Sequence, residues 1–400
     1  METTDADSTG HVNPEIMSKR IVYIVGDLSY PNGMSRVLSQ KVNYLAGHTD
    51  YELYVVLTEK ATMPWYYQLA PNVKHVNFDL NFDDLYQMPL YRRLLAYRKK
   101  QKQYRRQLTD YLMEVRPDIT VSVMRREINF INDIQDGSQK VGEIHFNKQT
   151  YRTFEKRWLP GFVNRYVTKK WQQSLEREIR KLDKFVVLTH EDFGFWQGFT
   201  NITVIPNPIY TYPDHGSSCS SKQAIAVGRY TYQKGFDMLI NTWTMVKQRH
   251  PDWTLRIYGA GEPEAYRKLV NEKGLNDTVF CEGATNDVYA KYDESSIFVL
   301  SSRYEGLPLV LIEAMSAGLP CVAFTCPCGP RDCINDGKDG LLVDSGNTTK
   351  LADAICQLIE NEPQRKQMGA AARQHALLFR EENIMRRWTE LFEKLKADRL

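Results

Sequence analysis

Short apolar segments alternate with longer amphipathic stretches along the whole chain. In the first half these segments are rich in Val and Ile and apolar on both faces, which is typical of buried parallel strands. They occupy residues 21–25, 51–57, 119–123, 140–146 and 184–189. The pattern restarts in the second half, at residues 224–228, 253–259, 296–301, 320–324 and 340–343. Strands that alternate with helices in this way predict α/β architecture, with doubly wound parallel sheets.

The two halves are separated by residues 205–222, which hold three prolines and a stretch rich in Gly and Ser. This composition predicts an exposed linker, with a domain boundary near Asn207. We therefore expect one domain over residues 19–206 and a second over residues 207–380. Ligands of open α/β sheets bind beyond the carboxyl ends of the strands, so two such domains should form a cleft with both sets of strand ends facing it.

The two ends of the chain lie outside this pattern. Residues 1–18 are polar and lack the apolar core of an export signal, so we expect a disordered tail, with Met17 as a candidate start. Residues 381–397 predict a final helix with one apolar stripe, and we expect the segment 381–400 to pack back toward the N-terminal domain. The stripe consists of Ile384, Trp388, Leu391, Phe392 and Leu395.

The composition, with 42% apolar and 25% charged residues, is that of a soluble globular protein. No apolar segment approaches the roughly 18 residues needed to span a bilayer. The seven cysteines have no disulfide-framework spacing, so we expect reduced thiols and a cytoplasmic location. The net charge of +3 is too small to indicate nucleic-acid binding, although residues 1–200 form the basic half, with 29 basic and 24 acidic side chains.

The most informative segment is 301–320, where a strand ends, a loop follows and a helix begins. The loop contains Gly306 and Pro308, and the backbone N–H groups at such a helix start suit a phosphate. Glu305 lies on the loop. Glu313 lies among apolar residues of the helix, where polyol hydroxyls would be suitable partners for its carboxylate. The alternative is a helix-start acid and a solvated helical Glu.

A second strand-to-helix loop follows residues 224–228 and contains Arg229 and Lys234. Two cations five residues apart can hold a diphosphate, Arg through its planar fork and Lys as a point charge. Solvated surface cations are the alternative.

Five segments together resemble the C-terminal half of a family-4-like retaining glycosyltransferase of the GT-B fold. In the family's order, between residues 224 and 343, they are VGRYTYQKG, YGAG, CEGA, SSRYEGLPLVLIEAMSAGLP and GPRDCINDGKDGLLV. The resemblance implies transfer of a sugar from a nucleotide-sugar donor, with retention of configuration and with no metal or other cofactor. The last segment also resembles a Gly-Pro-Arg/Ser-Glu-Ile-Ile pattern of transferases that build surface polysaccharides, with Asp332 in place of the Glu.

The same resemblance implies roles for individual residues. Arg229 and Lys234 would hold the donor diphosphate. Glu313 would bind the ribose hydroxyls, and Glu305 would face the donor sugar. The expected donor site also includes Gly259, Gly306, Leu307 and Pro308.

Residues 26–45 resemble the family's first loop and helix, where a Gly-rich turn leads to an Arg. Asn32 and Gly33 stand here in place of the usual pair of glycines. Gly33 would still allow the backbone to approach the donor closely, and Asp27 is another candidate on this loop.

His145 ends the strand expected at residues 140–146, which puts it at the cleft by the strand-end rule. It resembles the family's His beside the transferred sugar, and a structural His is the alternative. With Arg229, Lys234 and Glu305 it forms the expected catalytic set. Front-face attack is expected, with the leaving diphosphate taking the acceptor proton and the two cations stabilising its charge.

Four cysteines lie close together in the sequence, at Cys321, Cys326, Cys328 and Cys333. They lack a C-x2-C pair, and Cys321 opens an apolar strand, where a thiol behaves as a small hydrophobe. We therefore expect no metal site.

Residues 92–106 hold eight basic side chains and no acid, within a helix expected at residues 88–115. Helical geometry puts one apolar face opposite a basic face. The apolar face has Leu94, Tyr97, Tyr104, Leu108, Tyr111 and Val115, and the basic face has Arg92, Lys99, Lys102 and Arg106. Charge of one sign suggests an anionic membrane surface or an anionic acceptor, and a solvated face is the alternative.

These expectations combine into a hexosyltransferase with a nucleotide-sugar donor, most simply a UDP-sugar. Its acceptor would be a glycan growing on an anionic lipid carrier, with the protein peripheral on the inner face of the cytoplasmic membrane. The alternatives are a GT-B nucleotide-sugar epimerase or phosphorylase, and a non-catalytic nucleotide-sugar binding protein. A Rossmann dehydrogenase is disfavoured because residues 25–35 lack G-x-G-x-x-G.

Overall fold

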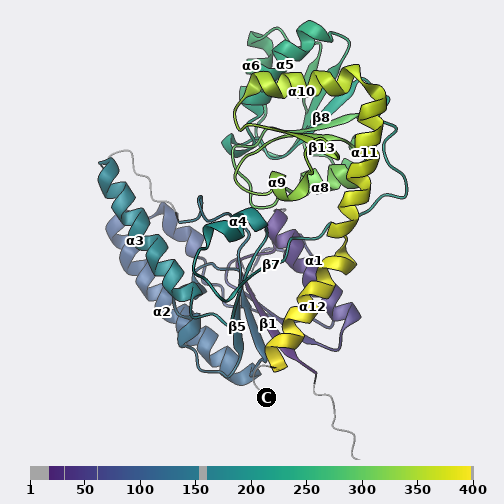
Figure 1. Ribbon diagram of the computed structural model, residues 1–400. Coiled ribbons are helices and arrows are strands. Elements are labelled where there is room, and N and C mark those ends of the chain that lie inside the picture. Colours follow the sequence, from purple (N-terminus) through teal and green to yellow (C-terminus); the bar gives the residue numbers. More distant parts are fainter. Residues whose placement is uncertain (1–17, 31, 61, 153–159, 398–400) are drawn as a thin grey trace, which may run out of the picture.

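The computed structural model describes residues 18–30, 32–60, 62–152 and 160–397. The expected tail at residues 1–18 lies outside the described residues except for Ser18. The chain forms two α/β domains, and the last helix runs from the second domain back along the first (Figure 1).

The N-terminal domain contains a seven-stranded sheet in the order β3-β2-β1-β4-β5-β6-β7, with all neighbours parallel. Its strands are β1 (Arg20–Val25), β2 (Glu52–Leu57), β3 (Lys74–Asn77), β4 (Ile119–Ser122), β5 (Gln139–Glu143), β6 (Lys184–Val187) and β7 (Ile202–Val204). Its helices are α1 (Gly33–His48), α2 (Leu90–Val115), α3 (Gly161–Ile179) and α4 (His190–Phe195).

The second domain contains a six-stranded parallel sheet in the order β10-β9-β8-β11-β12-β13. Its strands are β8 (Gln223–Val227), β9 (Thr254–Tyr258), β10 (Val279–Cys281), β11 (Ile297–Leu300), β12 (Cys321–Phe324) and β13 (Gly340–Val343). Its helices are α5 (Phe236–Arg249), α6 (Glu264–Glu272), α7 (Val288–Asp293), α8 (Leu309–Ser316), α9 (Pro330–Cys333), α10 (Thr348–Glu360) and α11 (Glu362–Ala376). The predicted fold of two doubly wound parallel sheets is therefore confirmed.

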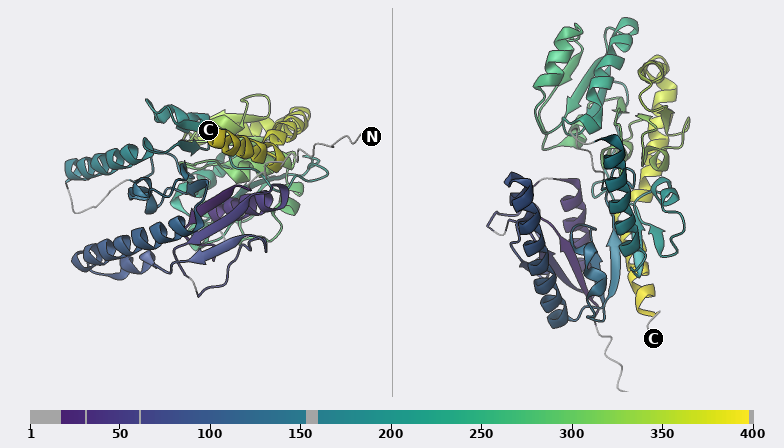
Figure 2. Two further views of the ribbon diagram at one scale, coloured as in Figure 1. Left: turned by 90° about the horizontal axis from the view of Figure 1, so that it is seen from below. Right: turned by 90° about the vertical axis from the view of Figure 1, so that its left-hand side faces the viewer.

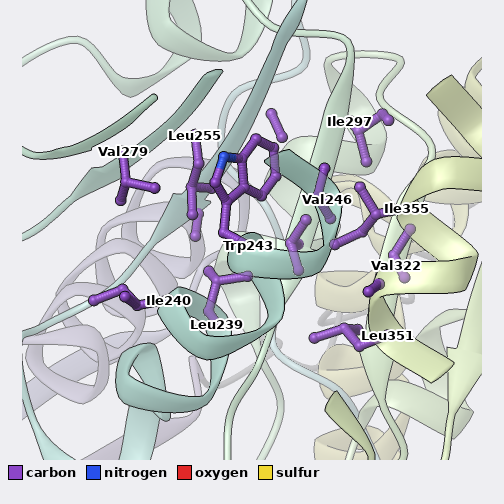
Figure 3. Packing of buried hydrophobic residues seen from close by; sticks show 14 of the residues in the cluster. Leu239, Ile240, Trp243, Val246, Leu255, Val279, Ile297, Val322, Leu351 and Ile355 are labelled. Carbon is purple, nitrogen blue, oxygen red and sulfur yellow. The ribbon is translucent and has the colours of Figure 1, made fainter. Parts of the chain in front are cut away.

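Each sheet is buried on both faces, which explains why its strands are apolar throughout. Along β1, Ile21 and Tyr23 belong to one core cluster, whereas Val22 and Ile24 belong to another on the opposite face. In the second domain, one such core is centred on Trp243 of α5, which packs among aliphatic side chains of the sheet and of α10 (Figure 3).

Helix α12 (Glu381–Ala397) joins the two domains (Figures 1 and 2). Its apolar stripe packs into the core of the N-terminal domain, where Trp388 and Phe392 are almost fully buried. A bridge between Ile209 and Arg380 holds the start of the helix against the interdomain segment.

The prediction of an exposed linker at residues 205–222 is wrong for the first part of this segment. Residues 205–209 are buried, because the segment passes between the domains, where the backbone N–H of Ile209 bonds the Phe379 carbonyl (2.9 Å). Beyond Ile209 the residues of this segment are exposed or partly buried, except for the buried Cys219. Among the described residues, no helix has the length and apolar character needed to cross a membrane.

Candidate active site

A cleft of about 720 Å³ lies between the two domains, where the carboxyl ends of both sheets meet. It brings together nearly all of the donor-site and catalytic candidates. Those that line it are Gly33, His145, Arg229, Lys234, Glu305, Gly306, Leu307, Pro308 and Glu313. Gly259 is not among the lining residues. A side chain on Gly259 would overlap the carbonyl of Gly228, so this glycine allows the loops after β8 and β9 to pack closely.

The loop after β8 presents the two expected cations. Gly235 ends this loop at φ +63°, where a Cβ would overlap the Ser301 carbonyl, so only glycine fits. The Lys234 ammonium forms an ion pair with Glu305 (2.8 Å). The Arg229 side chain is exposed, and no described residue forms a side-chain hydrogen bond or ion pair with it. Arg229 is therefore available to an anion in the cleft.

Glu305 is buried and held on several sides. Its Oε1 also accepts a hydrogen bond from the Ser302 hydroxyl (2.7 Å), and its backbone N–H donates to the Pro327 carbonyl (2.7 Å). Its carbonyl accepts from Asn147 Nδ2 of the N-terminal domain (2.6 Å). This carboxylate therefore has a fixed position beside Lys234.

Gly306 lets the two domains approach each other closely. A Cβ on Gly306 would lie 2.7 Å from the His145 carbonyl oxygen. Leu307 and Pro308 then lead into α8, so the backbone N–H groups of its first turn lie at the cleft. An alanine at position 306 would push the domains apart.

Glu313 forms an ion pair with Arg36 of α1, across the domain interface. Burial alone would lower the pKa of Arg36, but the attraction of Glu313 and its hydrogen bond raise the pKa overall. The Nε of Arg36 is buried and has no hydrogen-bond partner among the described residues. The partner expected for Glu313 was a ligand hydroxyl, whereas in this structure an arginine of the other domain occupies one of its oxygens.

His145 lies two residues beyond the end of β5, whereas the sequence predicted that the strand would reach it. Its Nε2 is 3.3 Å from Glu143 Oε1, and neither ring nitrogen forms a hydrogen bond in the described residues. Glu143 is itself paired with Lys41 of α1. Burial lowers the pKa of His145, outweighing the opposite effect of Glu143. The ring is therefore neutral at pH 7.

The neutral state of His145 predicts a pH dependence of stability. Protonation below the usual pKa of 6.5 favours the unfolded chain, so the contribution of this ring is complete above pH 6.5 and is lost as the pH falls toward the lowered folded-state pKa. His145→Gln should therefore lose less stability between pH 7.5 and 5.5 than the wild type in urea unfolding. Equal losses in both proteins would contradict this.

The loop before α1 holds Gly33 and Asp27. Asn32 caps the helix by accepting from the Ser35 N–H (2.9 Å), and Gly33 opens α1 with no atom within 4 Å of the position of a Cβ. Asp27 does not line the cleft; its carboxylate accepts from the Ser29 N–H (2.7 Å) and shapes the turn.

The site also contains residues that sequence reasoning did not single out. Tyr67, Arg125, Asn147 and Gln233 line the cleft. Arg125 and Asn147 lie on the loops that follow β4 and β5, so the strand-end rule applied to every strand would have drawn attention to these loops.

The cysteines at positions 321, 326, 328 and 333 are not among the residues that line the cleft. All seven cysteines are buried and free, and burial raises the pKa of Cys326 to about 12, with a smaller contribution from Glu305. Across the described ranges, no three His, Cys, Asp or Glu side chains are arranged to hold a metal ion. Asp332, at the position of the family's Glu, accepts from the backbone N–H groups of His190 (2.6 Å) and Glu191 (3.2 Å), and so joins the domains.

The basic residues Arg92, Lys99, Lys102 and Arg106 are all exposed on α2 and lie outside the cleft lining. The apolar face of α2, opposite these residues, is only partly buried against the rest of the domain. Tyr104 and Leu108 are buried, whereas Leu94 is 53% exposed. The N-terminal part of α2 extends away from the sheet (Figures 1 and 2), and Leu94 and Leu95 in this part are exposed.

Comparisons with known proteins agree with this architecture. Residues 213–375 match the family model of glycosyl transferases group 1. An uncharacterized glycosyltransferase of Haemophilus influenzae is 36% identical over 52% of this chain and 60% of its own length. An amylovoran biosynthesis glycosyltransferase of Erwinia amylovora is 31% identical over 52% of this chain and 62% of its own length. The chain thus spans about 60% of the length of these relatives.

A solved structure of TarM from S. aureus, in complex with Fondaparinux, alpha-GlcNAc-glycerol and UDP, aligns with a TM-score of 0.72 at 18% identity. The alignment covers 94% of this chain and 99% of that one, so the two proteins share the whole two-domain fold. The chain therefore has the GT-B fold, and its residues 213–375 match the family model of glycosyl transferases group 1.

Proposed function

We propose that this protein is a retaining hexosyltransferase that uses a UDP-sugar donor and acts in the biosynthesis of a cell-surface polysaccharide. One observation supports this most strongly: Arg229, Lys234, Glu305 and Glu313 meet in one cleft at the start of α8. The Erwinia relative is named a glycosyltransferase of amylovoran biosynthesis, and the TarM structure holds UDP.

The donor diphosphate would lie between the two cations and the N-terminus of α8. Arg229 is available to an anion, whereas Lys234 pairs with Glu305. An incoming diphosphate would compete for the ammonium and leave the Glu305 carboxylate free to accept hydrogen bonds from the sugar hydroxyls. Glu313 would accept from the ribose hydroxyls through the oxygen that Arg36 does not hold.

The chemical step needs no group beyond the donor and the acceptor. The bond from hexose C1 to the diphosphate oxygen breaks, and the acceptor oxygen bonds to C1 on the same face. The acceptor proton passes to the departing diphosphate. Arg229, Lys234 and the helix start stabilise the charge that develops there, so neither a metal ion nor another cofactor is required. The neutral His145 would contact the sugar without adding charge.

Two glutamate variants test the donor assignment. Glu313→Ala should weaken the binding of free UDP, because the ribose loses an acceptor. Glu305→Ala should leave UDP binding intact and reduce transfer. Titration calorimetry measures the UDP affinity of both variants, and UDP release in the presence of donor and acceptor measures transfer. Glu264→Ala, which changes an exposed glutamate of α6, is the matched control. UDP affinity of Glu313→Ala equal to that of the wild type would refute the ribose assignment.

The alternatives make different products. An epimerase converts one nucleotide sugar into another, a phosphorylase consumes phosphate, and a binding protein leaves the donor unchanged. Chromatography of the nucleotide sugars after incubation distinguishes all three from transfer, which releases UDP.

We also propose that α2 brings the enzyme to an anionic membrane surface, where a lipid-linked acceptor would lie. Its exposed basic residues match such a surface, and Leu95, which is exposed on the same side of the helix, would contact the acyl boundary. Each basic residue contributes about 1 kcal/mol near the surface, so four give roughly 4 kcal/mol, enough for reversible association.

Replacing Arg92, Lys99, Lys102 and Arg106 with Gln should abolish sedimentation with anionic vesicles and leave UDP affinity unchanged. High salt should release the wild type, and neutral vesicles should bind little of it. The control with the same change in charge replaces four exposed lysines of the second domain, Lys268, Lys273, Lys338 and Lys350. Equal sedimentation of the α2 variant and the wild type would rule out this contact.

A further inference from the structure

Each sheet has one place where the chain reverses its winding direction, and ligands of open α/β sheets bind at such switch points. In the second domain this place lies between β8 and β11, whose following loops hold Arg229 and Glu305. In the N-terminal domain it lies between β1 and β4. Gly26 follows β1 directly, and Arg125, three residues beyond the end of β4, lines the cleft.

The fold gives the Arg125 side chain a defined place. A Cβ on Gly26 would lie 2.5 Å from Arg125 Nη1, so the glycine makes room for the guanidinium. The preceding residue, Met124, has φ +61°, which costs energy for a side chain of this size. Tyr151 donates a hydrogen bond to the Met124 carbonyl and Ser122 accepts from its N–H, which keeps the loop in this conformation.

Among the described residues, none forms an ion pair with Arg125. Within the described part of the chain, no residue forms a hydrogen bond with its guanidinium either. Glu59 attracts Arg125 electrostatically, but Glu59 and Glu127 both have other partners. Glu59 pairs with Arg126 (3.1 Å), and Glu127 accepts from the Ser122 hydroxyl (2.6 Å) and from the Arg125 backbone N–H (3.0 Å). A partly buried cation without a partner is costly, so an anionic ligand here would be stabilising.

The surrounding wall suits a glycan. Tyr67 and Phe146 line the same cleft, and the Phe146 ring is half exposed and stacked on Tyr151 (6.1 Å between centroids). Aromatic rings and a planar guanidinium in one cleft offer an apolar surface for sugar rings and a fork for an oxyanion.

We infer that Arg125 binds an oxyanion of the acceptor, a phosphate or a carboxylate, so that the acceptor is an acidic glycan. This inference rests on the proposed glycosyl transfer, because it assigns the N-terminal wall to the acceptor. It adds a recognition residue for the acceptor that is separate from the donor cations.

In the test, the full chain is first saturated with UDP. It is then titrated separately with three oligomers of equal length, namely a glycerol phosphate oligomer, a uronate oligosaccharide and a neutral glucan. Calorimetry should show that at least one charged oligomer binds more tightly than the glucan. Tighter binding of the glycerol phosphate oligomer identifies the oxyanion as a phosphate, and tighter binding of the uronate identifies it as a carboxylate. Arg125→Gln should weaken that binding by about 10-fold or more, as for the loss of a charge-assisted hydrogen bond. Arg165→Gln, an exposed arginine of α3, should have no effect.

UDP affinity of Arg125→Gln should equal that of the wild type, which shows that the variant folds and that its donor site is intact. Equal binding of charged and neutral oligomers, no binding of any of them, or wild-type binding by Arg125→Gln would overturn the inference while leaving the donor site in place. Failure of the wild type to bind UDP would instead reject the proposed function.

Discussion

Replacing Lys234 with alanine should lower kcat/KM for sugar transfer by about 10- to 100-fold. The ammonium lies at the cleft and pairs with Glu305, and we expect it to interact more strongly with the diphosphate as negative charge develops there. A hydrogen bond to a charged group contributes about 1.5–3 kcal/mol, which corresponds to this range of rates.

The assay follows UDP release at subsaturating donor. Lys234→Arg should retain part of the rate because it keeps the charge, and Lys268→Ala, an exposed lysine of α6, should retain all of it. Thermal unfolding of Lys234→Ala checks that the unpaired Glu305 has not disrupted the loop. A rate within twofold of the wild type would show that Lys234 does not stabilise the leaving group.

Replacing Glu143 with Gln should lower the free energy of unfolding by about 3–5 kcal/mol, because it leaves the Lys41 ammonium buried without its counter-ion. Both side chains of the pair are 1% exposed. The Lys41 ammonium also lies 3.8 Å from the centre of the Trp388 ring. Burial lowers the pKa of Lys41, although Glu143 acts in the opposite direction.

Urea unfolding measures this loss, and a double variant separates its causes. Lys41→Met with Glu143→Leu removes both charges and keeps the volume apolar, so it should recover most of the stability lost in Glu143→Gln. A loss below about 1 kcal/mol for Glu143→Gln, the usual range of an exposed pair, would contradict a buried ion pair at this position.

The strands that sequence patterning predicted are those buried on both faces. The three it missed, β3, β7 and β10, are short strands at or near the edges of their sheets. In β3 all four residues are exposed or partly exposed, so the strand has no apolar signal. The last helix was predicted at residues 381–397 because its stripe of apolar residues is unbroken, and α12 has these bounds.

The candidate site also contains features that the sequence predicts and features that it does not. Residues within one loop, such as Arg229 and Lys234, could be grouped from their spacing in the sequence. The pairs that cross the interface, Arg36 with Glu313 and Asn147 with the Glu305 carbonyl, depend on how the domains meet. No local pattern encodes that geometry.

The most direct test of the central claim follows the fate of the donor sugar itself. The protein is incubated with a panel of UDP-α-hexoses in excess chelator and without acceptor, and proton NMR records the hexose released by slow hydrolysis before it mutarotates. Retaining transfer chemistry without a metal predicts that the α anomer appears first for the true donor, and that Lys234→Ala releases it more slowly. First appearance of the β anomer, or hydrolysis only after Mg²⁺ or Mn²⁺ is added, would contradict the account.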